Sequence, residues 1–212
     1  MTVCCPVVEL RQYTLRPGQR EVLIELFDRE FVESQEALGM RIIGQFLDLD
    51  RPDRFVWLRG FSDMATRKAG LEGFYGGPVW RANSAAANAT MLDVDDVLLL
   101  RPLNPATGFG EQPPRPRPGE QRPASDIVAT ICSLDAPVDP GAIERSVLPA
   151  LTPLAVLVTE PSENTFPALP VRTGEHVLVW VTRGAAEVPH VPGMVGDPVQ
   201  LRLEPTPRSQ LR

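Results

Sequence analysis

The chain has 212 residues, 43% of them hydrophobic and 23% charged, so it can bury a core and form one or two domains. Its 21 basic and 27 acidic residues give a net charge of −6, which argues against a nucleic-acid binder. No run approaches the roughly 20 apolar residues of a membrane span, and Met1 to Pro6 is too short for a signal peptide. We therefore expect a cytoplasmic protein that binds neither membranes nor nucleic acid.

The first hundred residues predict helices and strands in the order β-α-β-β-α-β. Alternating polarity marks the strands, apolar residues at helical spacing mark the helices, and Pro17-Gly18 and Gly39 bound the first helix. The predicted elements are a strand over 7–15, a helix over 17–39, strands over 41–48 and 54–61, helices over 63–72 and 78–89, and a strand over 91–101. This is the order of a ferredoxin-like unit.

Residues 104–125 differ from both sides of the chain, because prolines, glycines and charges leave almost nothing to bury. We predict an interdomain linker with polyproline character. The spacing of Pro113 and Pro116 also matches a PxxP motif, so the segment is either a plain spacer or a partner-binding motif.

The second half repeats the element order of the first in a reduced form. The predicted elements are a strand over 126–134, a helix over 140–151, and strands over 154–159, 175–183 and 199–203. Residues 184–198 show no helical periodicity, so the second helix is predicted to be lost. The predicted domains are 1–103, the proline-rich linker 104–125, and the degenerate unit 126–212.

The sequence contains no residue pattern that indicates a metal site or a cofactor-binding site. Cys4, Cys5 and Cys132 lack zinc-site spacing, and we expect the Cys4-Cys5 pair to be reduced. His176 and His190 are the only histidines, so we predict no metal site and no cofactor. The chain also lacks the motifs GxSxG, GxGxxG, HExxH and the P-loop. Any reaction would be acid–base chemistry of the isomerase, cyclase or lyase type, or a cofactor-independent monooxygenation.

Three segments of the first half resemble the NIPSNAP family of the dimeric α+β barrel superfamily. They are VELRQYTLRPG at 8–18, FVWLRGF at 55–61 and FYGGPVW at 74–80, and the resemblance covers residues 7–102. It implies an α+β fold in which two tandem ferredoxin-like units pack their sheets into a barrel, either within one chain or between the chains of a homodimer. It implies no particular reaction.

Strand parity suggests where a site could lie. One face of the predicted strands is apolar and suited to pack beneath the helices: Val8, Leu10, Val56 and Leu58. Alternate residues of a strand point to opposite faces, so the residues between these would line the enclosed face of the barrel. That second set mixes aromatic and charged side chains: Glu9, Arg11, Tyr13, Phe55, Trp57, Arg59 and Phe61. Such a mixture is typical of a small-molecule pocket. The alternative is that Glu9 pairs with an arginine and the aromatic residues only fill the barrel.

The favoured hypothesis is a protein of bacterial metabolism that binds a small hydrophobic or aromatic metabolite. In its catalytic form Glu9 is the base, Tyr13 a proton donor, and Arg11 and Arg59 stabilise negative charge. Further predicted ligand-binding residues are Trp80, His176 and Trp180, each with a structural alternative. A non-catalytic interaction or adaptor protein is the second hypothesis.

Overall fold

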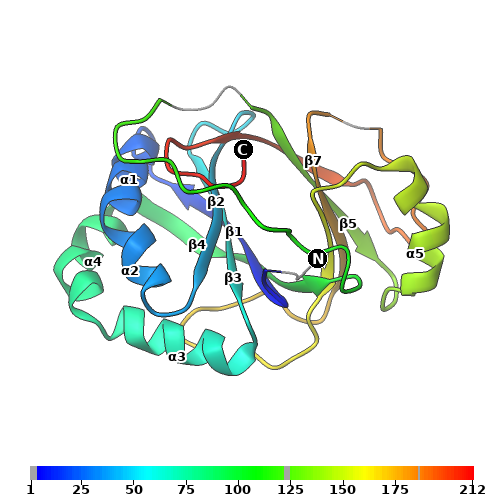
Figure 1. Cartoon of the computed structure of the whole chain (residues 1–212), viewed down its shortest axis with the longest axis horizontal. Coiled ribbons are helices and arrows are strands. Elements are labelled where there is room, and N and C mark those ends of the chain that lie inside the picture. The colour runs from blue at the N-terminus through cyan, green and yellow to red at the C-terminus, as the bar shows by residue number, and fades with distance from the viewer. Residues whose placement is uncertain (1–3, 122–124, 186) are drawn as a thin grey trace.

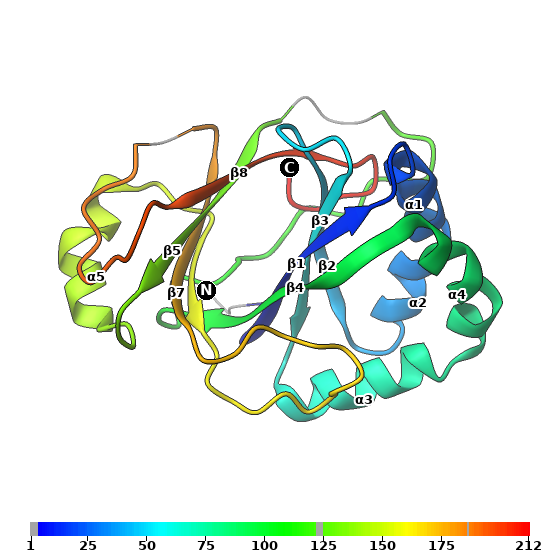
Figure 2. The ribbon, with the colours of Figure 1, turned by 180° about the vertical axis from the view of Figure 1, so that it is seen from behind.

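The computed structural model describes residues 4–121, 125–185 and 187–212. Eight antiparallel strands close into one barrel in the order β1-β3-β2-β8-β5-β7-β6-β4. Helices α1 to α4 cover one side of the barrel, and α5 lies on the opposite side (Figure 1; Figure 2). In these three segments no helix is long and apolar enough to cross a membrane.

The first half contains four strands and most of the helical structure. Its elements are β1 (Val7–Leu15), α1 (Arg20–Leu26), a π-helical segment (Phe27–Phe31), α2 (Val32–Glu36), β2 (Arg41–Asp48), β3 (Arg54–Phe61), α3 (Met64–Tyr75), α4 (Pro78–Thr90) and β4 (Met91–Pro102). The predicted order is confirmed. The first helix begins at Arg20 and not at Pro17, because Gly18 has a left-handed backbone (φ +73°) and donates its N–H to Asp53 Oδ1.

The second half supplies the other four strands. Its elements are β5 (Ile127–Leu134), α5 (Pro140–Ser146), a 3₁₀ turn (Leu148–Ala150), β6 (Ala155–Thr159), β7 (His176–Arg183) and β8 (Val199–Pro205). Between β7 and β8 the described part of the chain contains no helix, as predicted. Pairing of β2 with β8 and of β4 with β6 joins the halves. The barrel thus closes within one chain.

Aliphatic side chains from all eight strands fill the barrel interior. The cluster includes Val8, Leu10, Val56 and Leu58 together with residues of β5 to β8, such as Ile131. An eight-stranded barrel has an interior just wide enough for such side chains. The prediction that these four residues lie beneath the helices was therefore wrong.

The band of aromatic and charged residues lies on the outer face of the sheet, under the helices. Tyr13, Phe55, Trp57 and Phe61 share a second cluster with buried residues of the first-half helices, such as Phe27. This corrects the prediction that the band faces the barrel interior. These side chains lie between the sheet and the helices, because the interior is already filled by the other, mainly aliphatic set.

The proline-rich segment is packed against the barrel. Phe109 is 1% exposed and joins the interior cluster, and its carbonyl accepts a hydrogen bond from the Cys4 N–H at 3.1 Å. Pro116 is buried as well, so the expectation that this segment buries almost nothing was wrong. Cys4 and Cys5 form a disulfide, contrary to expectation, and Cys5 packs at the same end of the barrel beside Gly60. Residues 122–124 of the predicted linker lie outside the described residues.

Candidate functional site

A buried ion cluster lies between the sheet and the helices. Glu9 Oε2 accepts from Arg11 Nη1 at 2.9 Å and from Arg59 Nη2 at 2.6 Å, and Glu9 Oε1 accepts from Arg67 Nε at 2.7 Å. All four side chains are 0% exposed. Glu9 and Arg59 are paired across β1 and β3, and Arg67 reaches them from α3.

This environment fixes the charge of Glu9. Burial alone would raise the pKa of its carboxyl, but Arg59, Arg11 and Arg67 hold that pKa well below its ordinary value. A carboxylate held by three cations is a weak proton acceptor. The cluster therefore favours a structural role for Glu9 over the role of base.

The cluster carries more positive charge than its one carboxylate neutralises. Three arginines meet one glutamate, and the Nη2 atoms of Arg11 and Arg67 are buried without a hydrogen-bond partner among the described residues. Aromatic rings offset part of this charge: the Arg59 guanidinium carbon lies 4.8 Å from the centroid of Trp57, and that of Arg11 lies 5.4 Å from the centroid of Tyr13.

A cavity of about 90 Å³ adjoins the cluster, with space for several water molecules. Its walls are mostly aromatic and come from the sheet, the helices and a distant loop: Tyr13, Phe27, Phe31, Gln35, Trp57, Phe74, Tyr75, Trp80, Asn88, Met91, Val94 and Leu169. Gln35 connects the cavity to the ions, because its side-chain oxygen accepts from Arg59 Nη1 at 2.8 Å. A mainly apolar cavity with few polar groups is typical of small-molecule sites.

The loop from Glu160 to Glu175, which joins β6 to β7, covers the cavity from the second half. Asn164 and Thr165 accept hydrogen bonds from Arg67 Nη1 at 2.9 and 3.4 Å. The ring of Phe166 stacks on Tyr75 with a centroid distance of 5.9 Å, and Leu169 lines the cavity. Figure 2 shows this loop passing alongside α3. The second half thus completes the wall of a site built on the first.

The structure brings most of the predicted site residues together, on a different side of the sheet from the expected one. Tyr13, Trp57 and Trp80 line the cavity. Glu9, Arg11 and Arg59 form the ion cluster beside it. Phe55 packs edge-on against Tyr13, and Phe61 lies 5.5 Å from the Arg59 guanidinium carbon.

Two predicted residues lie elsewhere. Trp180 packs in the apolar cluster of the second half with Ile143 of α5. His176 lines a separate cleft of about 270 Å³ together with Arg172 and Glu175. Arg172 pairs there with Glu175 at 2.5 Å and with Asp96 at 3.1 Å, so its charge is already compensated.

Sequence reasoning missed several residues of the site. Arg67 resembles a surface arginine, yet it shares the buried face of α3 with Leu71 and Phe74 at helical spacing. That spacing is the signal that could have identified it. Gln35 follows Phe31 by one helical turn and was likewise recognisable as facing the sheet.

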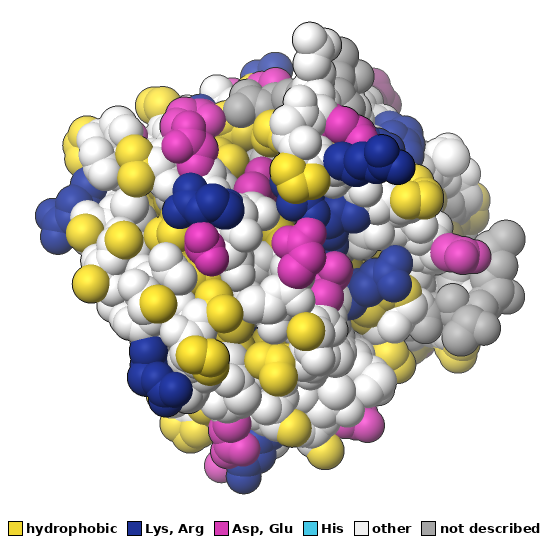
Figure 3. Space-filling view, turned by 60° about the vertical axis from the view of Figure 1, so that its left-hand side comes forward, with side chains coloured by type: hydrophobic (Ala, Val, Ile, Leu, Met, Phe, Trp, Pro, Cys, Tyr) yellow, Lys and Arg dark blue, Asp and Glu magenta, His cyan; other side chains and the backbone are white. Residues whose placement is uncertain are grey.

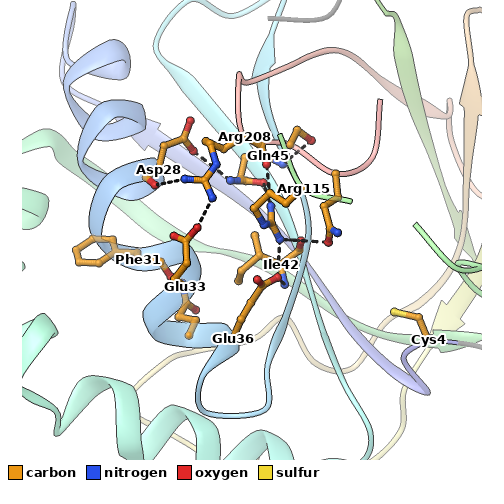
Figure 4. A network of polar contacts seen from close by, with 12 residues as sticks. Cys4, Asp28, Phe31, Glu33, Glu36, Ile42, Gln45, Arg115 and Arg208 are labelled. Atoms are coloured by element: carbon orange, nitrogen blue, oxygen red, sulfur yellow. Dashed lines mark hydrogen bonds and ion pairs between the residues drawn. The ribbon is translucent and has the colours of Figure 1, made fainter. Parts of the chain in front are cut away.

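A second polar network surrounds Arg115 of the proline-rich segment (Figure 4). Arg115 Nη2 bonds to Glu36 at 2.5 Å and to the Ile42 carbonyl at 2.7 Å, while its Nη1 bonds to the Arg208 carbonyl at 2.7 Å. Arg208 in turn pairs with Glu33. Proline-rich segment, C-terminal tail and α2 are thereby held together.

The comparisons agree with the resemblance of the first half. The NIPSNAP family model matches residues 8–105. The match to a NIPSNAP domain covers slightly less than half of the chain. An uncharacterised NIPSNAP-like domain protein from Burkholderia xenovorans is 24% identical over 54% of this chain and 97% of its own, with a TM-score of 0.43. A NIPSNAP family protein from Agrobacterium tumefaciens is 20% identical over 45% of this chain and 91% of its own, with a TM-score of 0.42.

The fold extends beyond the NIPSNAP domain. A putative monooxygenase from Fusobacterium nucleatum matches 95% of this chain and 92% of its own at a TM-score of 0.56. Its sequence identity is 8%, so the likeness concerns the fold alone. A search of curated proteins finds no match.

Proposed function

We propose that the protein binds a small aromatic metabolite of bacterial metabolism in the cavity between the NIPSNAP sheet and its helices. The observation that carries this proposal is the aromatic cavity beside the ion cluster, where Tyr13, Trp57 and Trp80 meet. The cavity is smaller than the roughly 300–1,000 Å³ of drug-sized sites. Its ligand is therefore compact, or the covering loop moves to admit it.

Tyr13 is the residue best placed for chemistry on such a ligand. Its hydroxyl oxygen accepts from Arg11 Nε at 3.0 Å, so the phenol proton is free to be donated toward the cavity that the residue lines. A catalytic form of the protein would use Tyr13 as proton donor, and neighbouring arginines would stabilise developing negative charge. Monooxygenation without a cofactor is a weaker alternative, testable by oxygen uptake with hydroquinones.

Tryptophan fluorescence tests the binding proposal directly. In a Trp180→Phe background the two remaining tryptophans, Trp57 and Trp80, both line the cavity. Titration with phenol should change the emission of these two tryptophans, and the change should saturate as the site fills. Leu169→Phe fills the cavity from the loop and should abolish the effect, whereas Leu92→Phe, at a position 57% exposed, should leave it intact. Absence of saturation in the background protein would refute the proposal.

We also infer that the barrel consists of two tandem ferredoxin-like units within residues 1–103 and 126–212, the second without its second helix. The strand orders β4-β1-β3-β2 and β8-β5-β7-β6 support this, because they are equivalent in the two halves. Closure within one chain favours a monomer over a homodimer. Light scattering during size-exclusion chromatography would return the mass of one chain.

The adaptor hypothesis has weaker support. The large apolar side chains exposed on the described residues, such as Val22, Leu49 and Val195, are scattered. On the face shown in Figure 3, apolar and charged side chains are interspersed. Pro116 is buried, so the Pro113–Pro116 spacing is not wholly accessible to a partner. Replacing the exposed Pro113 and Pro114 by alanine would test partner capture without removing Phe109 or Arg115.

A further inference from the structure

Three hydrogen-bond donors in or next to the wall of the aromatic cavity have no acceptor among the described residues. Trp57 lines the cavity, and its Nε1 is buried without a partner in the described parts of the chain. Arg11 Nη2 is also buried and unpartnered, and the Arg11 guanidinium carbon lies 5.4 and 5.6 Å from the ring centroids of Tyr13 and Trp57. The phenol proton of Tyr13 is the third donor. A buried donor left unpaired costs about 1–3 kcal/mol, so this group calls for an acceptor.

The charge of the site points in the same direction. Arg11, Arg59 and Arg67 have Glu9 as their only ion-pair partner within the described residues, which leaves an excess of two positive charges in a buried layer. Arginine does not lose its proton in proteins, so this excess cannot be relieved by titration. Cation–π contacts with the surrounding rings offset only part of it. An anion would neutralise the excess and accept from the free donors.

We propose that the ligand of the cavity is an aromatic carboxylate, whose oxygen accepts from Arg11 Nη2 and Trp57 Nε1 while its ring packs among Phe31, Phe74 and Trp80. This inference rests on the proposed function and names its ligand class. Arg11 is the recognition residue for the charge. Gln35 is a positioning residue, since its two polar atoms are already bound to Arg59 and to the Phe31 carbonyl.

Benzoate and benzamide have the same ring and a similar shape, but only benzoate carries a negative charge. Comparing their affinities therefore tests whether the site recognises the charge of the ligand. Calorimetric titration of the wild-type protein at neutral pH should show benzoate binding at least about tenfold more tightly than benzamide, since one charge-assisted hydrogen bond contributes about 1.5–3 kcal/mol. Benzamide binding as tightly as benzoate, or phenol binding where benzoate does not, would overturn the carboxylate proposal and leave the cavity proposal intact. If benzoate, benzamide and phenol all fail to bind, both the carboxylate proposal and the proposal that the cavity binds a ligand are refuted.

Variants test whether Arg11 is responsible for the preference. Arg11→Gln should bring the ratio of the two affinities close to one. Arg29→Gln removes one positive charge from an exposed pair in the same half and should keep the ratio. A purely structural role of Arg11 would lower stability without changing the ratio. If circular dichroism shows that Arg11→Gln does not fold, Trp57→Phe retains a ring, removes the second donor and should also reduce the ratio; an unchanged ratio there would contradict the proposal.

Discussion

Arg11 and Tyr13 lie two residues apart on β1, and the Nε–H of Arg11 donates to the Tyr13 hydroxyl oxygen at 3.0 Å. Residues at this spacing share a face of the sheet, so the strand itself brings guanidinium and phenol together. The same guanidinium binds Glu9, two residues earlier on the same face, at 2.9 Å. One strand thus carries a carboxylate, a guanidinium and a phenol in a single buried row, in which the phenol lines the cavity and the guanidinium lies beside it.

Tyr13→Phe should affect both stability and binding. It leaves the buried Arg11 Nε–H without its acceptor, which we expect to cost about 1–3 kcal/mol in urea unfolding. It should also weaken phenol binding. Tyr75→Phe is the matched control, because Tyr75 lines the same cavity and its hydroxyl has no hydrogen bond in the described structure. Equal losses of stability in both variants would argue against the Arg11–Tyr13 link.

The element order was predictable because each strand and helix of the first half carries its own periodicity. Gly39 ends the first helix region as predicted, with a left-handed backbone of φ +80°. The sequence did not show which face of the sheet lies toward the helices and which toward the barrel interior. The odd-numbered and the even-numbered residues of β1 and β3 both include large side chains. Val8 and Glu9 are each 0% exposed, so burial on both faces removed the usual contrast between polar and apolar sides.

The site was predictable in its first-half strands and in Trp80 of α4. Glu9, Arg11 and Arg59 were recognisable as a charged row, and the structure pairs Glu9 with both arginines. Asn164 and Leu169 come from a loop more than 150 residues away along the chain from Glu9 and Tyr13, and no local pattern connects them to the NIPSNAP domain. That contact depends on closure of the barrel, which brings β6 beside β4.

Glu9→Gln should be among the most damaging substitutions of the chain. It removes the one carboxylate shared by three buried arginines and leaves their charges uncompensated. Breaking a buried ion pair from one side costs about 3–5 kcal/mol. Glu30→Gln is the control, since the exposed Glu30–Arg29 pair should change stability by less than about 0.5 kcal/mol. Chemical unfolding of both variants measures the contrast, and a similar small loss in each would contradict the cluster's role.

Asn164→Ala should loosen the covering loop. Asn164 accepts from Arg67 and from the Phe166 N–H, and it donates to the Leu169 carbonyl, so one side chain organises the loop. In the Trp180→Phe background, acrylamide should quench the cavity tryptophans more strongly after this substitution. Glu163→Gln changes an exposed neighbour and should have no effect. Unchanged quenching in Asn164→Ala would show that the loop does not control access.

Arg115→Gln should release the proline-rich segment. Arg115 joins Glu36, the Ile42 carbonyl and the Arg208 carbonyl, and hydrogen bonds of charged groups contribute about 1.5–3 kcal/mol. We expect a loss of about 2 kcal/mol and faster proteolysis within residues 104–121. The matched control is Arg117→Gln, at an exposed position two residues away. It should change neither the stability nor the rate of proteolysis. Equal stability of the two variants would mean that contacts other than those of Arg115, such as the burial of Phe109 and Pro116, hold the segment.

Asp28 gives the protein a pH dependence of stability with a defined sign. Burial raises the pKa of Asp28 to about 6, although Gln45 and Arg208 oppose the shift. The unfolded carboxyl titrates near its ordinary value of 3.8, so between these values the folded state holds an extra proton. That extra stability is fully present below the unfolded pKa and is lost as pH rises through about 6. Partial exposure reduces the effect, so we expect about 1 kcal/mol to be lost between about pH 5 and pH 7.5.

The Asp28→Asn variant isolates this contribution. Asparagine keeps an oxygen that can accept from Gln45 Nε2, which lies 3.1 Å from Asp28 Oδ1, and it has no titrating group. The difference in unfolding free energy between wild type and variant cancels the titration of all other groups, provided that they are unperturbed by the substitution. Urea unfolding at the two pH values should show that difference shifting by about 1 kcal/mol in favour of the wild type at the lower pH. An unchanged difference would mean that Arg208 and Arg115 outweigh burial and keep the Asp28 carboxylate ionised at both pH values.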